Sequence, residues 1–327
     1  MEEVTNYILL AHAYWRRTGD GHIQRRHGET IRKFLDFVLA CDTTGNGVPD
    51  EGCTNTIDDA SPAVQYGREQ IYLAVKAMAA LRCGAELLAN AGYPGERLET
   101  YRKQAECILQ EVEAKGWLGD HYAVTLDPSA EGLRDPWTGE ALHGELAGWD
   151  AYHIYTANAL PILDMVACDL GLDDARLAQD MLNACRRTLT QYGCCHTDYH
   201  GEAQVSVVGD LVAVQSGTTG WVSMNMLRDL AAAYRGVDML NMAERYWDWQ
   251  AATNARDVRV FFETFGGNNL CFYPRGVAVW GVFEAVAGFV YDKVTGLREV
   301  NALRQTVRVP LLALADWSKR HVPYFEA

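Results

Sequence analysis

The sequence has no long apolar run and an excess of negative over positive charge. None of its apolar runs approaches the roughly 18 residues that suggest a membrane-spanning helix, and its start lacks the pattern of a secretory signal. Lysine and arginine number 29 against 43 aspartates and glutamates, so the net charge is −14. Such an acidic chain repels polyphosphates and anionic lipid, which argues against nucleic acid or a membrane as partner. A neutral substrate fits better.

The sequence also lacks a linker. No stretch rich in proline or serine and no change in composition divides the 327 residues, so we expect a single domain over 1–327. Hydrophobic residues make up 49% and charged residues 22% of the chain, as in folded globular proteins. The nine cysteines are odd in number, and most lie in helical patterns without metal-ligand spacing. We interpret them as reduced thiols and expect a cytoplasmic protein.

Apolar residues recur every three or four positions in several segments, which is the pattern of amphipathic helices. In 66–92, for example, Ile71, Val75, Met78 and Leu81 fall on one face. The sequence therefore predicts an all-α protein. The predicted helices are 4–17, 22–41, 66–92, 96–115, 159–170, 174–191, 221–234, 238–252, 277–290 and 310–320.

Links between these helices alternate between short and long. The long loops are 42–65, 116–158, 192–220 and 253–276. Each exceeds the roughly 12–15 residues beyond which a loop is usually functional or disordered. Because successive helices run antiparallel, the four long loops should share one face. We therefore predict an (α/α)6 toroid of antiparallel helical hairpins, with some helices missing, rather than a solenoid, because no motif repeats at a fixed period.

Loop 192–220 contains two further patterns. Val205, Val207 and Val208 precede a turn at Gly209-Asp210, which predicts a small β-hairpin. The run from His196 reads H-T-D-Y-H-G-E, whose residue types suit zinc but whose alternation is also typical of a solvated polar face. We favour the solvated face.

An acid pair, Asp58 and Asp59, lies just before Pro62 and the predicted helix 66–92. When two carboxyl groups lie close together, the pKa of at least one of them is raised, because two negative charges at short range repel each other. A carboxyl group of this kind suits the general acid of glycoside hydrolysis. Alternatively, the pair caps the helix that follows.

Residues 42–47 read D-T-T-G-N-G, which follows the start of an EF-hand calcium loop. The twelfth position is Cys53 instead of a bidentate glutamate, so the match is incomplete. Two interpretations stay open: calcium held by Asp42, Asn46 and Asp50, or a loop held by its own Asx turns. Apart from calcium, we expect no cofactor.

Loop 116–158 is rich in residue types that hold sugars. Aromatic rings offer flat apolar faces to a pyranose, while aspartate and histidine reach its hydroxyls. Alternatively, the rings only anchor the loop. Arg275 precedes the predicted helix 277–290, where it could bind a hydroxyl or pair with an acid. The residues predicted to contact substrate are Trp149, Asp150, Tyr152, His153, Tyr155 and Arg275.

The run Asp42 to Asp50, then Asn55-Thr-Ile-Asp58-Asp59 and the helix containing Ile71-Tyr-Leu-Ala-Val-Lys-Ala77, resembles a known family. It is similar to the (α/α)6 catalytic domains of glycoside hydrolase families 52 and 116, which contain retaining β-xylosidases and β-glucosidases. The resemblance implies an exo-acting glycosidase with Asp58 as acid/base and Asp59 as second candidate. It also implies that 149–158 and 273–275 line the sugar pocket.

The chain departs from these families at its start. Their nucleophilic glutamate lies farther upstream of the acid than this chain extends, and a β-sandwich precedes their helical ring. We therefore expect the chain to lack the β-sandwich and the first helices. Two alternative functions stay open: a glutaminase-type amidase on a helical toroid, and a non-catalytic carbohydrate-binding protein.

Overall fold

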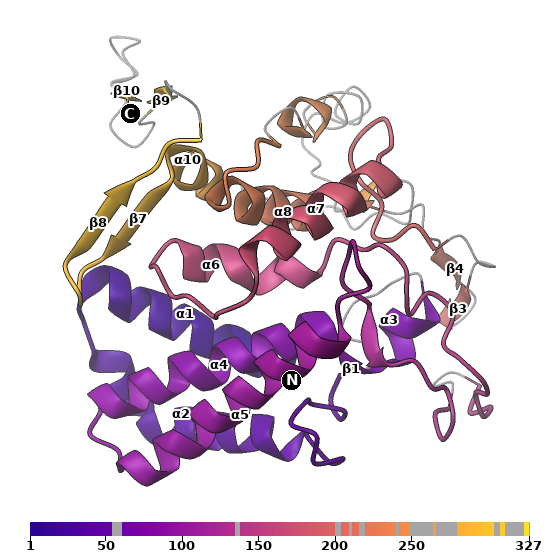
Figure 1. Cartoon of the computed structure of the whole chain (residues 1–327), viewed down its shortest axis with the longest axis horizontal. Helices are drawn as coiled ribbons and strands as arrows, with labels where there is room; N and C mark the ends of the chain where they lie inside the picture. Colours follow the sequence, from indigo (N-terminus) through magenta and orange to yellow (C-terminus); the bar gives the residue numbers. More distant parts are fainter. Residues whose placement is uncertain are drawn as a thin grey trace.

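The computed structural model describes residues 1–53, 61–134, 138–199, 204–208, 211–215, 220–239, 242–246, 248, 264–265, 280–303, 308–310 and 324–326. Helices dominate these residues, and their strands are short and form two-stranded antiparallel sheets (Figure 1). The coarse prediction of a helix-rich protein is therefore confirmed. In the described segments, none of the helices is both long and apolar enough to cross a lipid bilayer.

The helices are α1 (Glu2–Thr18), α2 (His22–Ala40), α3 (Pro62–Tyr66), α4 (Ile71–Asn90), α5 (Gly95–Lys115), the 3-10 turn η1 (Thr156–Ala159), α6 (Leu160–Asp164), α7 (Asp174–Thr188), α8 (Val222–Tyr234) and α10 (Trp280–Ala287). The described helices α1 and α2 contact each other, as do α4 and α5, whereas α6, α7 and α10 each contact α8. The strands are β1 (Arg68–Gln70), β2 (Thr125–Asp127), β3 (Gln204–Val208), β4 (Leu211–Gln215), β5 (Gly220–Trp221), β6 (Thr264–Phe265), β7 (Phe289–Asp292), β8 (Leu297–Val300), β9 (Arg308–Pro310) and β10 (Tyr324–Glu326).

Helix α4 lies at the centre of the N-terminal half. It is buried nearly all round, because almost every residue from Ile71 to Leu88 is apolar or small. It contacts α1, α2, α5 and η1. Helix α5, in contrast, buries one stripe that includes Leu98, Ala105 and Val112. The hairpins α1–α2 and α4–α5 therefore form a layered block, which Figure 1 shows in indigo and magenta.

Three predicted helix ends differ from the structure because local backbone geometry stops the helix. Helix α4 begins at Ile71 rather than 66, because β1 pairs with β2 directly before it and Glu69 has a left-handed φ of 50°. Helix α6 stops at Asp164, and Ala167 beyond it has a φ of 52°. Helix α10 stops at Ala287, after which the chain turns into the unpredicted hairpin β7–β8.

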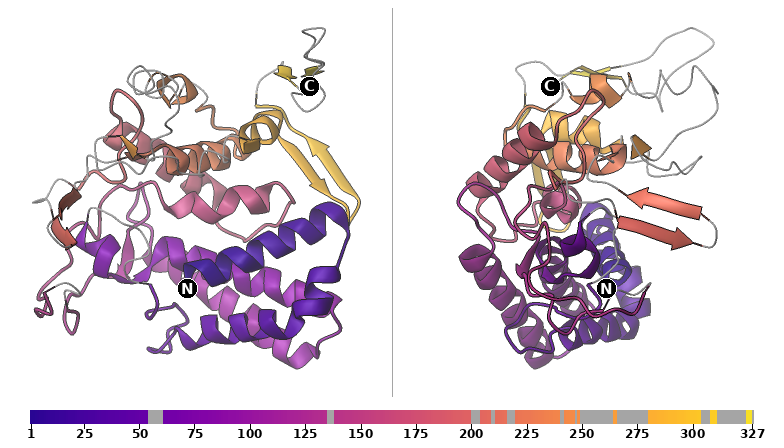
Figure 2. Two further views of the ribbon diagram at one scale, coloured as in Figure 1. Left: turned by 180° about the vertical axis from the view of Figure 1, so that it is seen from behind. Right: turned by 90° about the vertical axis from the view of Figure 1, so that its right-hand side faces the viewer.

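The hairpin β7–β8 ties the last described helix back to the first. Lys293 N donates to Arg16 O over 2.7 Å, and the Arg16 guanidinium bonds Asp292. Figures 1 and 2 show the hairpin reaching from α10 to the end of α1. The hairpin that follows α10 is thus bonded to the end of α1.

The predicted small hairpin is confirmed in the backbone, where β3 pairs with β4 and Val208 lies opposite Leu211. The prediction of a helix at 310–320 is wrong at its start, because Pro310 belongs to β9. The rest of that segment lies outside the described residues. Of the predicted helix 238–252, the described residues 242–246 are helical.

Candidate functional site

The long loops meet one another through their described parts. Ala63 N, at the end of loop 42–65, donates to Ala147 O of loop 116–158 over 3.2 Å. Loop 116–158 is joined to loop 192–220 by the bond from Ile154 N to His196 O, which measures 3.1 Å. Strand β5 at the end of that loop pairs with β6, which lies in loop 253–276. The described parts of successive long loops thus contact one another, and we call this region the loop face.

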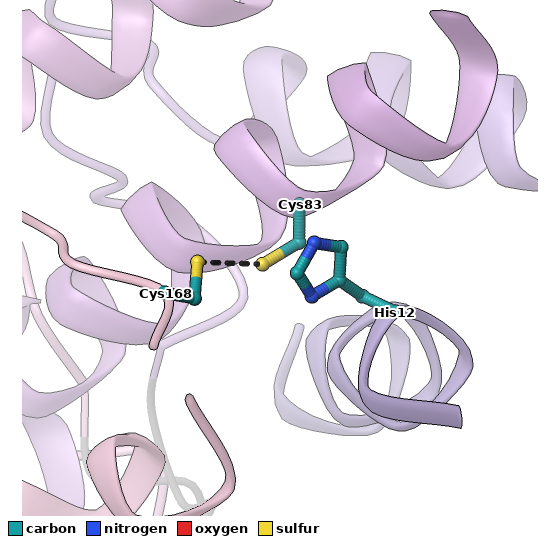
Figure 3. A group of neighbouring side chains, drawn as sticks. All are labelled: His12, Cys83 and Cys168. Atoms are coloured by element: carbon teal, nitrogen blue, oxygen red, sulfur yellow. Dashed lines mark hydrogen bonds between the residues drawn. The ribbon is translucent and has the colours of Figure 1, made fainter. Parts of the chain in front are cut away.

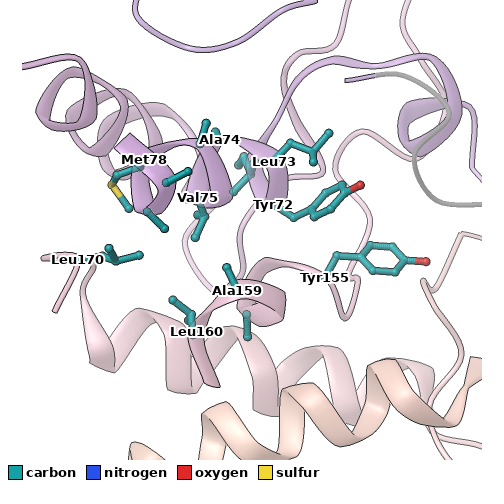
Figure 4. Close-up of a cluster of buried hydrophobic side chains, with 14 of the residues drawn as sticks. Tyr72, Leu73, Ala74, Val75, Met78, Tyr155, Ala159, Leu160 and Leu170 are labelled. Carbon is teal, nitrogen blue, oxygen red and sulfur yellow. The ribbon is translucent and has the colours of Figure 1, made fainter. Parts of the chain in front are cut away.

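A row of aromatic rings lies at the loop face. Ring centroids are 6.0 Å apart for Tyr72 and Tyr155, 5.8 Å for Tyr155 and His196, and 4.2 Å for His196 and Trp221. All four side chains are buried. Figure 4 shows Tyr72 and Tyr155 side by side, with both hydroxyls pointing away from Met78 and Leu160. We call these four residues the aromatic row.

The row stands at the N-terminal ends of three helices. Tyr72 is in the first turn of α4, Tyr155 directly precedes η1, and Trp221 directly precedes α8. Because the helices run away from the loop face, their first N–H groups and the positive ends of their dipoles face the same region.

Buried polar groups fix the second half of the row. His196 Nε2 accepts a hydrogen bond from Trp221 N over 3.0 Å. On α8, Asn225 Oδ1 accepts from Cys194 N, and Asn225 Nδ2 donates to Cys194 O and Trp221 O, at 2.8 to 2.9 Å. The favoured interpretation of His196 as part of a solvated polar face is therefore wrong, because its side chain is 0% exposed.

A buried ion pair lies beside the first ring of the row. The Lys76 ammonium lies 5.8 Å from the Tyr72 ring centroid and bonds the Glu2 carboxylate at the start of α1. The side chain of Lys76 is 4% exposed and that of Glu2 is 20% exposed. A charged donor and a charged acceptor are thus present within the buried surroundings of Tyr72.

His153, which the sequence assigns to substrate binding, supports Tyr155 from within the core. Its Nε2 lies 3.2 Å from Ala123 O, and its Nδ1 accepts from Tyr155 N over 3.3 Å. Complete burial lowers the pKa of His153 to about 4, so the ring is neutral at physiological pH. The geometry gives His153 a positioning role for the row.

Tyr152 and Asp150, two other residues assigned to substrate binding, lie on the side of the loop that faces α7. The Tyr152 hydroxyl donates to Asp120 over 2.6 Å, and its ring stacks on His121 at 3.8 Å. Asp150 offers its backbone oxygen to His121 Nε2, and its side chain is exposed. The structure therefore separates these two residues from Tyr155. Trp149 is half-buried and packs against the core.

The catalytic prediction falls on residues outside the described part of the chain, as does Arg275. Asp58 and Asp59 precede Ser61, which is described and buried. The Ser61 hydroxyl accepts from Val64 N over 3.2 Å and so caps α3. A cap for this helix is thus present without the acid pair.

The residues of the calcium prediction accept hydrogen bonds from their own loop. Asp42 accepts from Gly45 N and Gly47 N, and Asp50 accepts from Thr43 N and Thr43 Oγ1, at 2.6 to 2.9 Å. Asn46 Oδ1 accepts from Val48 N, and its amide donates to Glu69. These contacts match the Asx-turn interpretation. Calcium would have to displace or share the same oxygens.

Sequence reasoning missed a buried acid next to the loop face. Asp180 of α7 is 2% exposed and accepts a hydrogen bond from Tyr122 N over 2.9 Å. Its burial raises the pKa of Asp180 to about 7. The sequence pattern could have indicated this acid, because Asp180 falls on the same helix face as Leu177 and Ala184, where an apolar residue is expected.

Models of protein families and the curated proteins were both compared with the sequence. No family model and no curated protein matches this chain.

Proposed function

We propose that the chain is the catalytic part of an exo-acting glycoside hydrolase of the β-xylosidase or β-glucosidase type. The observation that supports this most is the aromatic row at the loop face, where three helices begin. The buried rings would form the rigid base of a sugar site, and helix N-termini suit the oxygens of a sugar. The (α/α) toroid belongs to the same proposal, and the tie between β7–β8 and α1 supports it.

Asp58 is the general acid and base in this proposal, and Asp59 is its neighbour. Two facts support the assignment. Ser61 caps α3, so this helix has a cap that does not involve the acid pair. In addition, Ser61 packs closely against Gly148 of loop 116–158, at the junction of the long loops. A Cβ atom added to Gly148 would lie only 2.9 Å from Ser61 Cβ.

The chemistry follows the two-carboxylate scheme. Asp58 donates its proton to the glycosidic oxygen as the bond to the anomeric carbon breaks, and the alcohol leaves. In the retaining course that the resemblance implies, a second carboxylate forms the glycosyl ester. Water then cleaves the ester, and its proton returns to Asp58. The aromatic row is buried, so it would support the wall of the sugar site from beneath during both steps.

A panel of nitrophenyl glycosides tests this proposal with the full chain. Turnover of a β-xyloside or β-glucoside, at a rate well above the uncatalysed reaction, is the expected result. Hydrolysis of glutamine without glycoside turnover would replace the proposal with an amidase. Saccharide binding without any turnover would make the chain a binding protein.

Substitutions then assign the carboxyl groups. Asp58→Asn should lower turnover of substrates with poor leaving groups about 10²–10⁴-fold, the usual size of proton-transfer catalysis. Activated aryl glycosides should suffer less, because their leaving group hardly needs the proton. Asp59→Asn should shift the pH profile, since it removes a neighbouring charge. Glu99→Gln, at an exposed position on α5, is the matched control. Equal effects of both aspartate variants on both substrate types would refute the assignment.

A further inference from the structure

Three side chains of types that bind metals lie close together beside the C-terminal half of α4, the half that is remote from Tyr72. His12 lies on α1, Cys83 lies on α4, and Cys168 follows α6. A ring nitrogen of His12 and both Sγ atoms lie within 4.8 Å of one another. Figure 3 shows the three side chains close together, from three separate segments. In the part of the chain that the structure describes, no other histidine, cysteine and carboxylate side chains form such a group. We call these residues the His-Cys-Cys cluster.

The surroundings of His12 leave one ring nitrogen available. The side chain is 0% exposed, and its Nε2 lies 2.8 Å from Glu86 Oε2. A carboxylate accepts a hydrogen bond, so Nε2 carries the proton and Nδ1 keeps its lone pair. Nδ1 is buried without a hydrogen-bond partner. A carboxylate that orients a histidine in this way is the usual second partner of a metal-bound imidazole.

The sulfur atoms are already at a suitable distance. Cys83 Sγ and Cys168 Sγ lie 3.8 Å apart. In a tetrahedral zinc site with Zn–S bonds of about 2.3 Å, two sulfur ligands lie about 3.8 Å apart and a sulfur and a nitrogen about 3.6 Å apart. The sulfur pair therefore fits without moving, and the His12 ring would have to move closer to the two sulfur atoms.

Cys168 connects the cluster to a cavity. This cavity has a volume of about 360 Å³ and is lined by Cys168, Asp164, Arg235, Tyr234 and Asn301, among others. Cys83 is buried, whereas Cys168 is half-buried. Cys168 is therefore the member of the cluster that a metal ion and a water molecule can approach from the cavity. The nearby Arg16 guanidinium is balanced by ion pairs with Glu86 and Asp292.

We propose that His12, Cys83 and Cys168 bind a thiophilic divalent metal ion of the zinc type, with the fourth position open to a water molecule from the cavity. The ion replaces the two thiol protons, which leave to solvent, so that two thiolates balance its charge. Bound metal would join α1, α4 and the segment after α6, three elements that are far apart in sequence. Glu86 is the positioning residue of this site.

The chain offers a matched control for the sulfur pair. Cys185 Sγ and Cys194 Sγ lie 3.6 Å apart, so they form a similar dithiol. No histidine completes a cluster there among the described residues. This pair should not hold a dication.

Metal binding by the full chain tests the proposal. The reduced, chelator-treated protein is titrated with Zn²⁺ against a chromophoric chelator, and with Co²⁺ as a spectroscopic probe. We expect one tight equivalent and a sulfur-to-cobalt charge-transfer band. Cys168→Ser should abolish the band and weaken Zn²⁺ binding at least tenfold, whereas Cys185→Ser should keep both.

A second variant separates coordination from folding. Glu86→Gln, at a carboxylate that is 41% exposed, should leave the near-UV spectrum unchanged and weaken Zn²⁺ binding about 10–100-fold. Absence of a tight equivalent in the wild-type chain would overturn the proposal. So would tight binding and a charge-transfer band that persist in Cys168→Ser, or that are lost in Cys185→Ser instead.

Discussion

The buried carboxyl group of Asp180 makes stability depend on pH in a defined direction. Burial raises the pKa of Asp180 to about 7, whereas an aspartate in an unfolded chain has a pKa of about 3.9. The folded state therefore holds a proton that the unfolded state releases between these values. The stabilising contribution of the protonated form is complete below about pH 4 and is lost as the pH rises through about 7.

The full difference corresponds to about 4 kcal/mol in the free energy of unfolding, and the range from about pH 5.5 to 8 covers about 2 kcal/mol of it. In Asp180→Asn, the amide oxygen can still accept from Tyr122 N, and the site no longer titrates. As the pH rises over this range, the free energy of unfolding of the variant should fall by about 2 kcal/mol less than that of the wild-type chain.

Urea unfolding at both pH values, for wild type and Asp180→Asn, measures this difference. Glu99→Gln removes an exposed carboxyl group from α5 and should follow the wild type. A parallel pH dependence of wild type and Asp180→Asn would refute the reasoning, because it would mean that Asp180 ionises in the folded protein as it does in the unfolded chain.

Four further predictions concern the loops. Asn225→Ala should lower the free energy of unfolding by about 3 kcal/mol in urea titrations, because it leaves buried backbone groups of Cys194 without partners. Gly148→Ala should cost about 1–3 kcal/mol in the same assay, because φ is 80° and its Cβ would approach Ser61. Ser61→Ala should cost about 1 kcal/mol as the lost cap of α3. Calcium should leave the melting temperature unchanged, because loop donors already bond Asp42 and Asp50, and a rise with calcium would restore the calcium interpretation.

The sequence was sufficient for features that depend on local periodicity. The stripes of α1, α2, α5, α7 and α8 predicted these helices to within a few residues. The valines around Gly209-Asp210 predicted the hairpin β3–β4, because alternation and turn residues are both local signals. The alternation of short and long links predicted that the long loops meet, since antiparallel helices bring alternate ends together.

Helix ends and the candidate site were harder to predict from sequence. The start of α4 depends on the pairing of β1 with β2, whose partner residues Arg68 and Asp127 are distant in sequence. The run 149–155 suggested one sugar-binding surface, but its side chains make contacts on different sides of the segment. Tyr155 thus joins the aromatic row, while Tyr152 faces α7.

Only the tertiary structure could assemble the His-Cys-Cys cluster. Each of its residues, read alone, looks like an ordinary member of a helical or loop segment, and the spacing between them matches no metal-binding motif. The same holds for Asp180, whose raised pKa needs the burial that loop 116–158 and α7 create together. Periodicity along the chain determined which segments became helices, because that information is local. Packing between distant segments decided which polar groups are enclosed together, because burial depends on neighbours that the local pattern does not specify.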